Sequence, residues 1–413
     1  MSDWIKAEEY CVSVFDGTHD TPKVTETGFK LVTSKNILSN TLDLNSAYFI
    51  SEEDFVNINK RSKVKQYDIL FSMIGTVGSL YFETSDTIDY AIKNIGVFSC
   101  GDKEKAEWLY YYLQSSYAQQ YIKRYLNGAV QKFLPLKGLR EFPVPQFNKE
   151  LHNRIKILLN IDQKIQINNQ INQELEAMAK TLYDYWFVQF DFPDQNGKPY
   201  KSSGGKMVYN PELKREIPEG WGVEALKDFE SKIITGKTPS RANSDNFGGE
   251  IPFITIGDIR GNTFIYSTSE TLTDLGASVQ QNKYLPQGSL CVSCIATVGE
   301  IGFTTEPSHT NQQINSIVFE DETNRYYLYF ALKNYFENAN ASAKTGNTFA
   351  NMNKEDFSGI KIIFPNKEIK NNFHKITEPY FSQIKCLQGQ NQELTQLRDW
   401  ILPMLMNGQV KVE

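Results

Sequence analysis

The stretch DILFSMIGTVGSLYF, residues 68 to 82, decides the fold because a near copy, SLCVSCIATVGEIGF, follows at residues 289 to 303. Setting Asp68 on Ser289 gives an offset of 221 residues. The same offset pairs three residues further along, namely Asn94 with Asn315, Val97 with Val318 and Phe98 with Phe319. One short match could arise by chance, so further anchors are required.

Such anchors occur in the same order along both halves of the chain. They are Trp4 with Trp221, Thr21-Pro22 with Thr238-Pro239, Leu109-Tyr110 with Leu328-Tyr329, Gly128 with Gly346, Asn148-Lys149-Glu150 with Asn366-Lys367-Glu368, and 172–175 with 391–394. The offset drifts by only a few residues. Ordered anchors with small drift are typical of an internal repeat. The sequence therefore predicts one unit written twice.

Length and composition agree with two soluble domains. The chain has 413 residues, 40% of them apolar, and a formal net charge of −6. No apolar run approaches the roughly 20 residues of a membrane helix. The N-terminus, MSDWIKAEEY, is acidic and lacks an apolar signal region, so we expect a cytoplasmic protein with no membrane partner.

The five cysteines do not form a disulfide pattern. Cys291 and Cys294 raise the question of a metal site, but the repeat pairs them with Leu70 and Met73. A structural zinc needs four ligands, and no second pair lies nearby. We interpret both cysteines as small residues of a buried strand and predict no metal site.

Each half begins with a mixed region and ends with a long helix. Residues 1–145 contain short apolar runs between Gly, Asn, Ser and Thr, which predict strands and turns, and one aromatic stretch with helical spacing. Residues 221–364 repeat this arrangement. Each globular domain is therefore predicted to be α+β, and the segment 189–220, rich in Gly, Pro, Lys and Ser, to be a connection.

The ranges 146–188 and 365–406 show apolar residues at alternating steps of three and four, as in a coiled coil. The predicted seam residues are Ile157, Ile161, Ile171, Leu175, Met178, Leu182, Ile376, Tyr380, Leu387, Leu394, Leu397 and Ile401. Polar Asn168, Gln383 and Gln390 would fix the register. Ordinary core packing is the alternative, but a helix of about 40 residues is about 60 Å long and exceeds the width of a small domain.

Two related domains joined by a pair of antiparallel helices would share the two-fold symmetry of duplex DNA. Such a protein would place two reading heads roughly 34–36 Å apart on one face of the duplex. The heads differ in their loops, so the expected target is a split sequence with two unlike halves.

The repeated strand motif, the turns GTHDTP and GKTPS, and the helix ends ELEAMAKTLYDYWF and ELTQLRDWILPML together resemble the specificity subunits of type I restriction-modification systems. The resemblance covers the chain from end to end. It implies two target recognition domains, one for each half of a bipartite DNA site, and two long helices packed as an antiparallel coiled coil with pseudo-two-fold symmetry. It also implies double-stranded DNA, two methyltransferase subunits and two restriction subunits as partners.

The chain carries none of the catalytic motifs expected of those partners. It has no GxxxxGK[ST] phosphate loop and no consecutive prolines of the kind found in the adenine methyltransferase tetrapeptide. We therefore expect a non-catalytic subunit without cofactor. The resemblance assigns S-adenosylmethionine, ATP and magnesium to the partner subunits, whose complex methylates adenine and cleaves DNA.

Candidate DNA-contacting residues are polar or basic side chains in predicted turns. In the first half they are Thr18, His19, Lys23, Lys60, Arg61, Lys63, Lys65, Asn127, Gln131 and Lys132. In the second half they are Lys237, Thr238, Ser240, Arg241, Asn243, Lys344, Thr345, Asn347 and Asn351. Asn and Gln of NQQIN, residues 311 to 315, are further possible readers of adenine, although the matching first-half sequence NIGVF favours a structural strand.

Each candidate also has a structural interpretation. His19 can serve the turn alone, and the basic run NKRSKVKQ can be a solvated strand edge whose alternation points the charges to one side. A net charge of −6 is unfavourable for binding phosphates, so we expect weak DNA binding without the methyltransferase subunits. The alternative functions are a scaffold with two protein-binding heads and a self-sufficient restriction enzyme.

Overall fold

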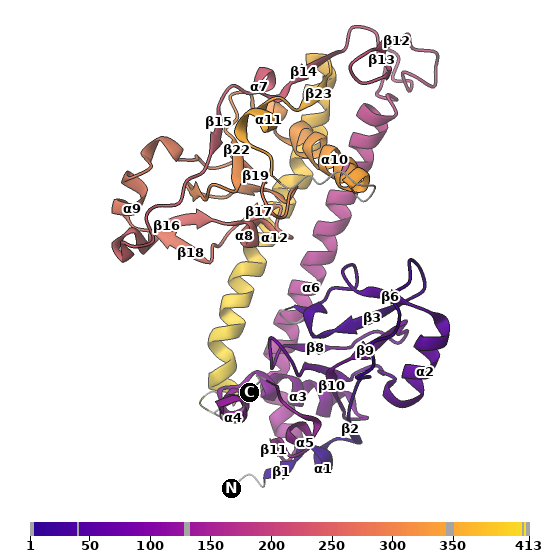
Figure 1. Cartoon of the computed structure of the whole chain (residues 1–413), viewed down its shortest axis with the longest axis vertical. Helices are drawn as coiled ribbons and strands as arrows, with labels where there is room; N and C mark the ends of the chain where they lie inside the picture. Colours follow the sequence, from indigo (N-terminus) through magenta and orange to yellow (C-terminus); the bar gives the residue numbers. More distant parts are fainter. Residues whose placement is uncertain (1–3, 39–40, 128–132, 344–350, 407–408, 410–413) are drawn as a thin grey trace. The chain divides into compact units, whose positions relative to one another are not determined.

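The computed structural model describes residues 4–38, 41–127, 133–343, 351–406 and 409 (Figure 1). Nothing is described of the side chains of residues 127, 151 and 340–343. The chain divides into two compact units. Unit 1 comprises residues 1–163 and 395–413, and unit 2 comprises residues 164–394.

Unit 1 is a mixed α+β structure, as predicted. Its elements before the long helix are β1 (Trp4–Lys6), α1 (Ala7–Tyr10), β2 (Ser13–Asp16), β3 (Phe29–Thr33), η1 (Ser34–Asn36), β4 (Ile37–Leu38), β5 (Thr41–Leu42), β6 (Tyr48–Ile50), α2 (Glu52–Ser62), β7 (Ile69–Ser72), β8 (Leu80–Phe82), β9 (Tyr90–Lys93), β10 (Ile95–Ser99), α3 (Lys103–Gln114), α4 (Ser116–Asn127), α5 (Leu136–Arg140) and β11 (Pro143–Pro145).

Unit 2 repeats this composition. Its elements are β12 (Met207–Asn210), β13 (Arg215–Pro218), β14 (Gly222–Ala225), α7 (Leu226–Phe229), β15 (Ile233–Thr235), η3 (Ser244–Asn246), β16 (Phe247–Ile254), α8 (Ile256–Ile259), β17 (Phe264–Ile265), β18 (Glu270–Leu272), α9 (Asp274–Ser278), η4 (Gln281–Lys283), β19 (Leu290–Ser293), β20 (Ile301–Thr304), β21 (His309–Thr310), β22 (Ile314–Ile317), η5 (Glu322–Asn324), α10 (Arg325–Ala343), α11 (Lys354–Ser358) and β23 (Lys361–Phe364).

The two units share one sheet topology, which confirms the duplication. The main sheet has the order β2-β10-β7-β8 in unit 1 and begins β15-β22-β19-β20 in unit 2. A second sheet has the order β6-β3-β9 in unit 1 and β18-β16-β21 in unit 2, and its second pair is parallel in both. A third pair joins the first and last strands of each unit, β1 with β11 and β14 with β23.

The stretch that opened the sequence forms the same strand, turn and strand in both units. Ser72 and Ser293 each end the first strand, and each backbone carbonyl accepts a hydrogen bond from a glycine, Gly78 N at 3.0 Å and Gly299 N at 2.9 Å. Both glycines have φ of +95°, a conformation that strongly favours Gly. Backbone geometry and burial therefore explain why this stretch is so similar in the two halves.

Some of the sequence anchors are wrong by two residues. Strand register aligns Gly96, not Asn94, with Asn315, because these two residues pair with Asp16 and Thr235 at the ends of equivalent strands. Trp4 likewise lies within β1, whereas Trp221 precedes β14. Short insertions and deletions between strands allowed chance matches at a neighbouring offset.

The long helices are α6 (Lys149–Tyr183), continued by the π-helical segment η2 (Asp184–Val188), and α12 (Lys367–Met406). Their bounds lie close to the predicted ranges. Within unit 2 the two helices are antiparallel, because Asn168 donates to Asn391 at 2.8 Å while Tyr183 contacts Phe373 further along. Within unit 1 Arg398 pairs with Asp162 at 3.0 Å.

The predicted seam is only partly correct. Ile161 and Leu387 are buried, and Leu175, Leu182, Tyr380, Leu394 and Ile401 are half-buried. Five predicted seam residues are instead 36% to 52% exposed, namely Ile157, Ile171, Met178, Ile376 and Leu397. Asn168, a predicted seam position, is buried as expected, but beyond it the buried stripe of α6 in unit 2 lies about one position further along than predicted, at Asn172, Ala179 and Tyr183. Because several residues at these contacts are small or polar, the apolar periodicity of the sequence does not identify this buried stripe.

The segment 189–220 is more ordered than a simple connection. It contains the β12–β13 hairpin, and Phe190 is fully buried in the core of unit 2. Phe192 stacks on Trp221 with ring centroids 4.8 Å apart. The Gly, Pro and Lys content of this segment masked its aromatic anchors.

Cys291 and Cys294 are buried, like their counterparts Leu70 and Met73, so the interpretation as core residues is confirmed. Burial raises the pKa of Cys291 to about 12 and that of Cys294 to about 11, which keeps both thiols protonated. Within the described ranges, no group of three or more His, Cys, Asp or Glu residues has the geometry of a metal site. Of the helices so described, none is both long and apolar enough to cross a membrane.

Candidate nucleic-acid interface

A chain of hydrogen bonds joins three separate segments at one edge of the unit 1 sheet. Asp16, at the end of β2, accepts from His19 Nε2 at 3.0 Å through Oδ2 and from Arg61 Nη2 at 3.3 Å through Oδ1. His19 Nδ1 lies 2.8 Å from Asn94 Oδ1. We call Asp16, His19, Arg61 and Asn94 the Asp16 cluster. It links the β2 turn, the end of α2 and the β9–β10 turn.

The local sequence accounts for this convergence. Gly17 lies so close to the neighbouring strand that a Cβ there would be 2.4 Å from the carbonyl oxygen of Ile92, so only glycine fits. Asn94 has φ of 54°, a left-handed conformation that Asn tolerates better than most residues. The close approach and the turn bring His19 and Asn94 together.

The basic run of unit 1 does not form a strand edge. Lys60 and Arg61 lie in the last turn of α2, where cations interact favourably with the helix dipole. Lys63 and Lys65 follow in an extended connection and alternate with buried Val64. The predicted alternation of exposure is therefore confirmed from Arg61 to Lys65, although its predicted secondary structure is wrong.

Thr18 and Lys23 flank the Asp16 cluster in the β2 turn. The Thr18 backbone N–H donates to Ile92 O at 3.0 Å, so this residue holds the turn to the sheet. Lys23 is exposed. Asn127 ends α4, and its side chain, with Gln131 and Lys132, lies outside the described residues.

The equivalent turn of unit 2 has the same backbone bonds and different side chains. Gly236 N donates to Ile314 O at 3.1 Å, as Gly17 N donates to Ile95 O at 2.9 Å in unit 1. The next residue, Lys237, donates its backbone N–H to Thr310 O at 3.0 Å. From this glycine to the following proline the turn is two residues shorter in unit 2, so no residue occupies the place of His19.

Polar contacts restrain most candidate side chains of this second turn. Thr238 donates to Gln312 Oε1 at 2.6 Å. Arg241 forms a bidentate pair with Glu270 at 2.9 and 2.8 Å, and this hydrogen-bonded pairing lowers the pKa of Glu270. Asn243 caps η3 through the Asp245 N–H. The guanidinium of Arg241 is thus neutralised locally, whereas Lys237 and Ser240 are exposed.

The remaining unit 2 candidates fall in two places. Lys344, Thr345 and Asn347 lie outside the described residues, and Asn351 is exposed and bridges to Ile295 beside the repeated turn. In NQQIN the Asn311 side chain accepts from Gln313 N at 3.0 Å. This turn precedes the buried strand β22, so the structural interpretation of NQQIN is favoured.

Sequence reasoning missed several members of these clusters. Asp16 and Glu270 were not candidates because acidic residues repel phosphates, and Asn94 was considered only as a repeat anchor. Each holds a candidate side chain in place. The available signal was the position of Asp16 directly before a glycine turn with a histidine three residues away.

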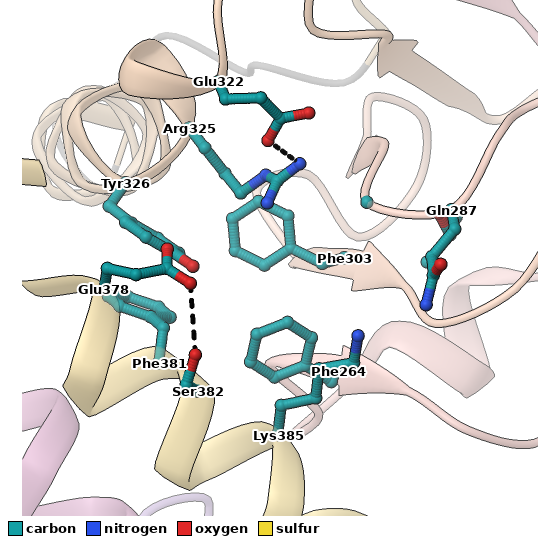
Figure 2. Close-up of a pocket in the computed structure, with 12 residues that line it drawn as sticks. Phe264, Gln287, Phe303, Glu322, Arg325, Tyr326, Glu378, Phe381, Ser382 and Lys385 are labelled. Atoms are coloured by element: carbon teal, nitrogen blue, oxygen red, sulfur yellow. Dashed lines mark hydrogen bonds and ion pairs between the residues drawn. The ribbon is translucent and has the colours of Figure 1, made fainter.

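A pocket of about 380 Å³ in unit 2 lies apart from these turns, against α10 and α12 (Figure 2). The rings of Phe264, Phe303 and Phe381 form its apolar wall, and Arg325 pairs with Glu322 at its rim. The pairing neutralises the guanidinium. Lys385 and Glu378 also line the pocket, so its two basic and two acidic side chains leave no net positive charge to attract a phosphate.

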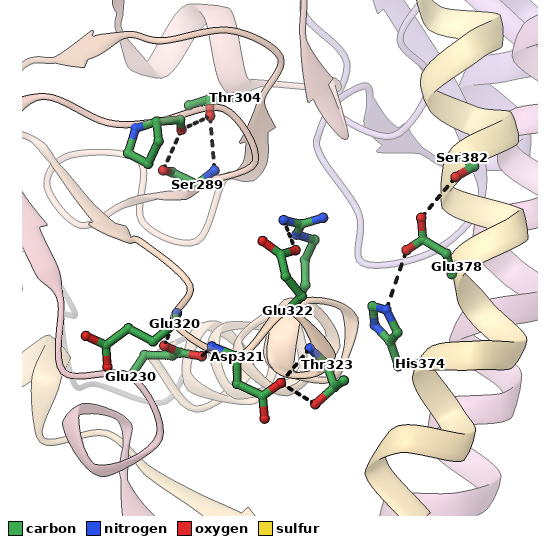
Figure 3. A network of polar contacts seen from close by, with 12 residues as sticks. Glu230, Ser289, Thr304, Glu320, Asp321, Glu322, Thr323, His374, Glu378 and Ser382 are labelled. Carbon is green, nitrogen blue, oxygen red and sulfur yellow. Dashed lines mark hydrogen bonds and ion pairs between the residues drawn. The ribbon is translucent and has the colours of Figure 1, made fainter.

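The start of α10 is held by a network of polar groups (Figure 3). Glu230 is buried and accepts from the Glu320 backbone N–H and from the Asn324 side chain, both at 2.7 Å. Asp321 accepts from Thr323 N at 3.0 Å. Burial raises the pKa of Glu230, but its oxygens are satisfied by these donors, so the network is structural.

Comparison with known proteins decides the family. The family described as type I restriction modification DNA specificity domain matches the chain twice, over residues 18–177 and 218–396. The chain belongs to this family. All candidate DNA-contacting residues lie within the matched ranges, and Asp16 lies two residues before the first of them. This membership places the chain among the DNA-recognition subunits, which are non-catalytic, and confirms the resemblance in the sequence.

Two sequence relatives agree with this assignment. The HindI specificity subunit of Haemophilus influenzae is 32% identical over 409 residues, covering 85% of this chain and 88% of that protein. The MjaIX specificity subunit of Methanocaldococcus jannaschii is 27% identical over 317 residues, covering 75% of this chain and 70% of that protein. A crystal structure of an S subunit from M. genitalium is 13% identical, covers 98% and 96%, and has a TM-score of 0.47.

Proposed function

We propose that this specificity subunit reads a bipartite DNA site, with one unit for each half-site. The observation that carries the proposal is the pair of equivalent turns, which share backbone hydrogen bonds but present different side chains. Phosphate contacts position a protein on DNA, and contacts to base edges specify the sequence. A shared scaffold with unlike turns suits two readers of unlike half-sites.

The available donors differ between the two units. Unit 1 presents Arg61, Lys63 and Lys65, all exposed, beside the Asp16 cluster. Unit 2 presents Lys237 and Ser240. Lysines bind phosphates as point charges, whereas arginine forms bidentate contacts with phosphate or guanine. We therefore expect most backbone contacts from lysines and sequence reading from the turns.

The subunit also recruits methyltransferase and restriction subunits in this proposal. Ile167, Ile171 and Met178 lie on α6 in unit 2 and are 36% to 52% exposed, an apolar surface of the kind that binds protein. The net charge of −6 supports a need for partners that contribute positive charge around the DNA. S-adenosylmethionine, ATP and magnesium would bind those partners.

An exchange of domains tests the proposal. Residues 221–364 are replaced with the equivalent segment of another family member, and methylated adenines are mapped by sequencing in a host that expresses the matching methyltransferase. We expect one half of the methylated motif to change and the other half to stay. The reciprocal exchange of residues 1–145 serves as the control. If either exchange changed both halves, independent reading by the two units would be wrong.

A further inference from the structure

The Asp16 cluster contains one side chain that is held at one end and free at the other. Arg61 is 70% exposed at its side chain, and within the described part of the chain its polar contact is made by Nη2, 3.3 Å from Asp16 Oδ1. Asp16 itself is 7% exposed. Its other oxygen is bound to His19, so the carboxylate cannot turn away from Arg61 without breaking a second bond.

His19 is restrained in a different way from Arg61. Both of its ring nitrogens are engaged, Nε2 with Asp16 at 3.0 Å and Nδ1 with Asn94 at 2.8 Å. No ring nitrogen remains to contact a base. His19 therefore connects the β9–β10 turn to Asp16, and the prediction that it contacts DNA directly is not favoured by this geometry.

We propose that Arg61 is the specificity-determining residue of unit 1 and reads a guanine, and that Asp16 is the residue that positions it. This inference rests on the proposed function and names the reader of one half-site. The guanidinium has further N–H donors beyond the one bound to Asp16, and guanine presents two acceptors, N7 and O6, in the major groove.

The neighbouring cations do not have this support. Lys60, one residue earlier in α2, binds only Asn57 of its own helix, at 2.9 Å. Lysine is a flexible point charge suited to phosphate. In unit 2, Arg241 is bound to Glu270 through both terminal nitrogens, so its terminal edge is occupied. Among these residues, the role of reading a guanine is therefore assigned to Arg61.

The test maps methylated adenines in hosts that express the methyltransferase subunits together with the full chain. In each host the full chain is either wild type or one of four variants. Arg61→Ala is expected to make one guanine position of one half-site degenerate, with at least a 10-fold loss of preference. Asp16→Asn is expected to relax the same position by a smaller factor. The matched control Lys60→Ala removes a cation from the same helix turn and should leave the motif unchanged.

The double variant Asp16→Asn/Arg61→Ala separates positioning from a general structural role. If Asp16 acts through Arg61, the double variant resembles Arg61→Ala, because neighbouring residues in one network are not additive. Misfolding would instead lower methylation at all sites without changing the motif. Should Asp16→Asn reduce the protein yield, exposed His19→Ala takes its place and should relax the same position.

Several outcomes would overturn the inference. An unchanged motif for Arg61→Ala, degeneracy at a position other than guanine, or equal degeneracy in both half-sites would each reject Arg61 as the reader. A double variant much worse than Arg61→Ala would reject positioning through Arg61. A wild-type motif that is not bipartite would instead reject the proposed function, so the two failures can be told apart.

Discussion

The β2 turn of unit 1 and the β15 turn of unit 2 start from the same strand end and diverge within three residues. In unit 1 the turn is longer and its histidine joins a buried carboxylate to two other segments. In unit 2 the turn is shorter, Thr238 donates a hydrogen bond to Gln312, and Arg241 pairs with Glu270. Conserved backbone geometry thus separates the scaffold from the residues that can vary.

The largest expected effect concerns the glycines that begin both turns. A Cβ at Gly17 would lie 2.4 Å from Ile92 O, and one at Gly236 would lie 2.1 Å from Asn311 O. Because these obstacles are backbone atoms, Gly17→Ala and Gly236→Ala should each destabilise their own unit by at least about 2 kcal/mol.

Hydrogen exchange measured by mass spectrometry can show which unit has lost stability in each variant. Gly17→Ala should accelerate exchange in β10 and leave β22 unchanged, and Gly236→Ala should do the reverse. Exposed Gly220, where a new Cβ would meet nothing within 4 Å but φ is +84°, gives the control for backbone strain alone. Equal acceleration in both strands would contradict independent folding of the two units.

The second comparison is between Tyr67 and Gly288. Both donate a backbone N–H to an acceptor at the end of the second strand that follows, Tyr67 to Glu83 O directly after β8 at 2.7 Å and Gly288 to Thr304 O at the end of β20 at 2.9 Å. Both have positive φ, +68° and +81°. Tyrosine in this conformation is strained, so we expect packing of its ring to offset the strain and stabilise unit 1. The ring stacks on Phe82 with centroids 6.2 Å apart.

Two variants of Tyr67 separate strain from packing. Tyr67→Ala keeps the strained Cβ and loses the ring, and should cost about 2 kcal/mol because the ring is only half-buried. Tyr67→Gly loses the same ring but relieves about 1 kcal/mol of left-handed strain. Denaturant unfolding should therefore rank Tyr67→Gly between wild type and Tyr67→Ala. The reverse order would show that backbone strain is unimportant here.

Much of the fold was predictable because it repeats. Gly78 and Gly299 keep the turn, and Leu70 and Met73 identified Cys291 and Cys294 as core residues. The seam was less predictable, because polar or small Asn168, Asn172 and Ala179 occupy buried contact positions. Ile171 and Met178 fit the apolar seam pattern but are exposed. The sites were hardest. The contacts of Arg61 with Asp16 and of Arg241 with Glu270 join residues distant in sequence, which composition cannot show.

A smaller effect should follow from releasing Arg241. Glu270→Gln keeps the side-chain shape but removes the charge that neutralises the guanidinium. A freed arginine adds about one phosphate contact, so the slope of log affinity against log salt should steepen by about 0.9. Fluorescence anisotropy with the methyltransferase complex measures this slope. Exposed Glu306→Gln, which removes the same charge elsewhere in unit 2, is the matched control and should not steepen the slope. An unchanged slope for Glu270→Gln would place Arg241 away from the DNA.

The smallest effect at neutral pH concerns His309, whose counterpart in the strand register of unit 1 is Ala91. Burial lowers the pKa of His309 below its ordinary value of 6.5. The folded unit therefore binds a proton less readily than the unfolded chain. The contribution of neutral His309 to the free energy of unfolding is therefore fully present above pH 6.5. It is lost as the pH falls toward the lowered pKa, because only the unfolded chain gains a proton there.

His309→Ala should consequently unfold with a weaker pH dependence than wild type. Between pH 7.5 and pH 5.5 we expect the Tm of unit 2 to fall by less in this variant than in wild type, measured by differential scanning calorimetry. Half-buried His374, whose pKa is also lowered by desolvation, is present in both proteins, so its effect is the same in both. An equal drop in both would mean that His309 is protonated in the folded unit, and that the two repeats do not differ in acid sensitivity at this strand.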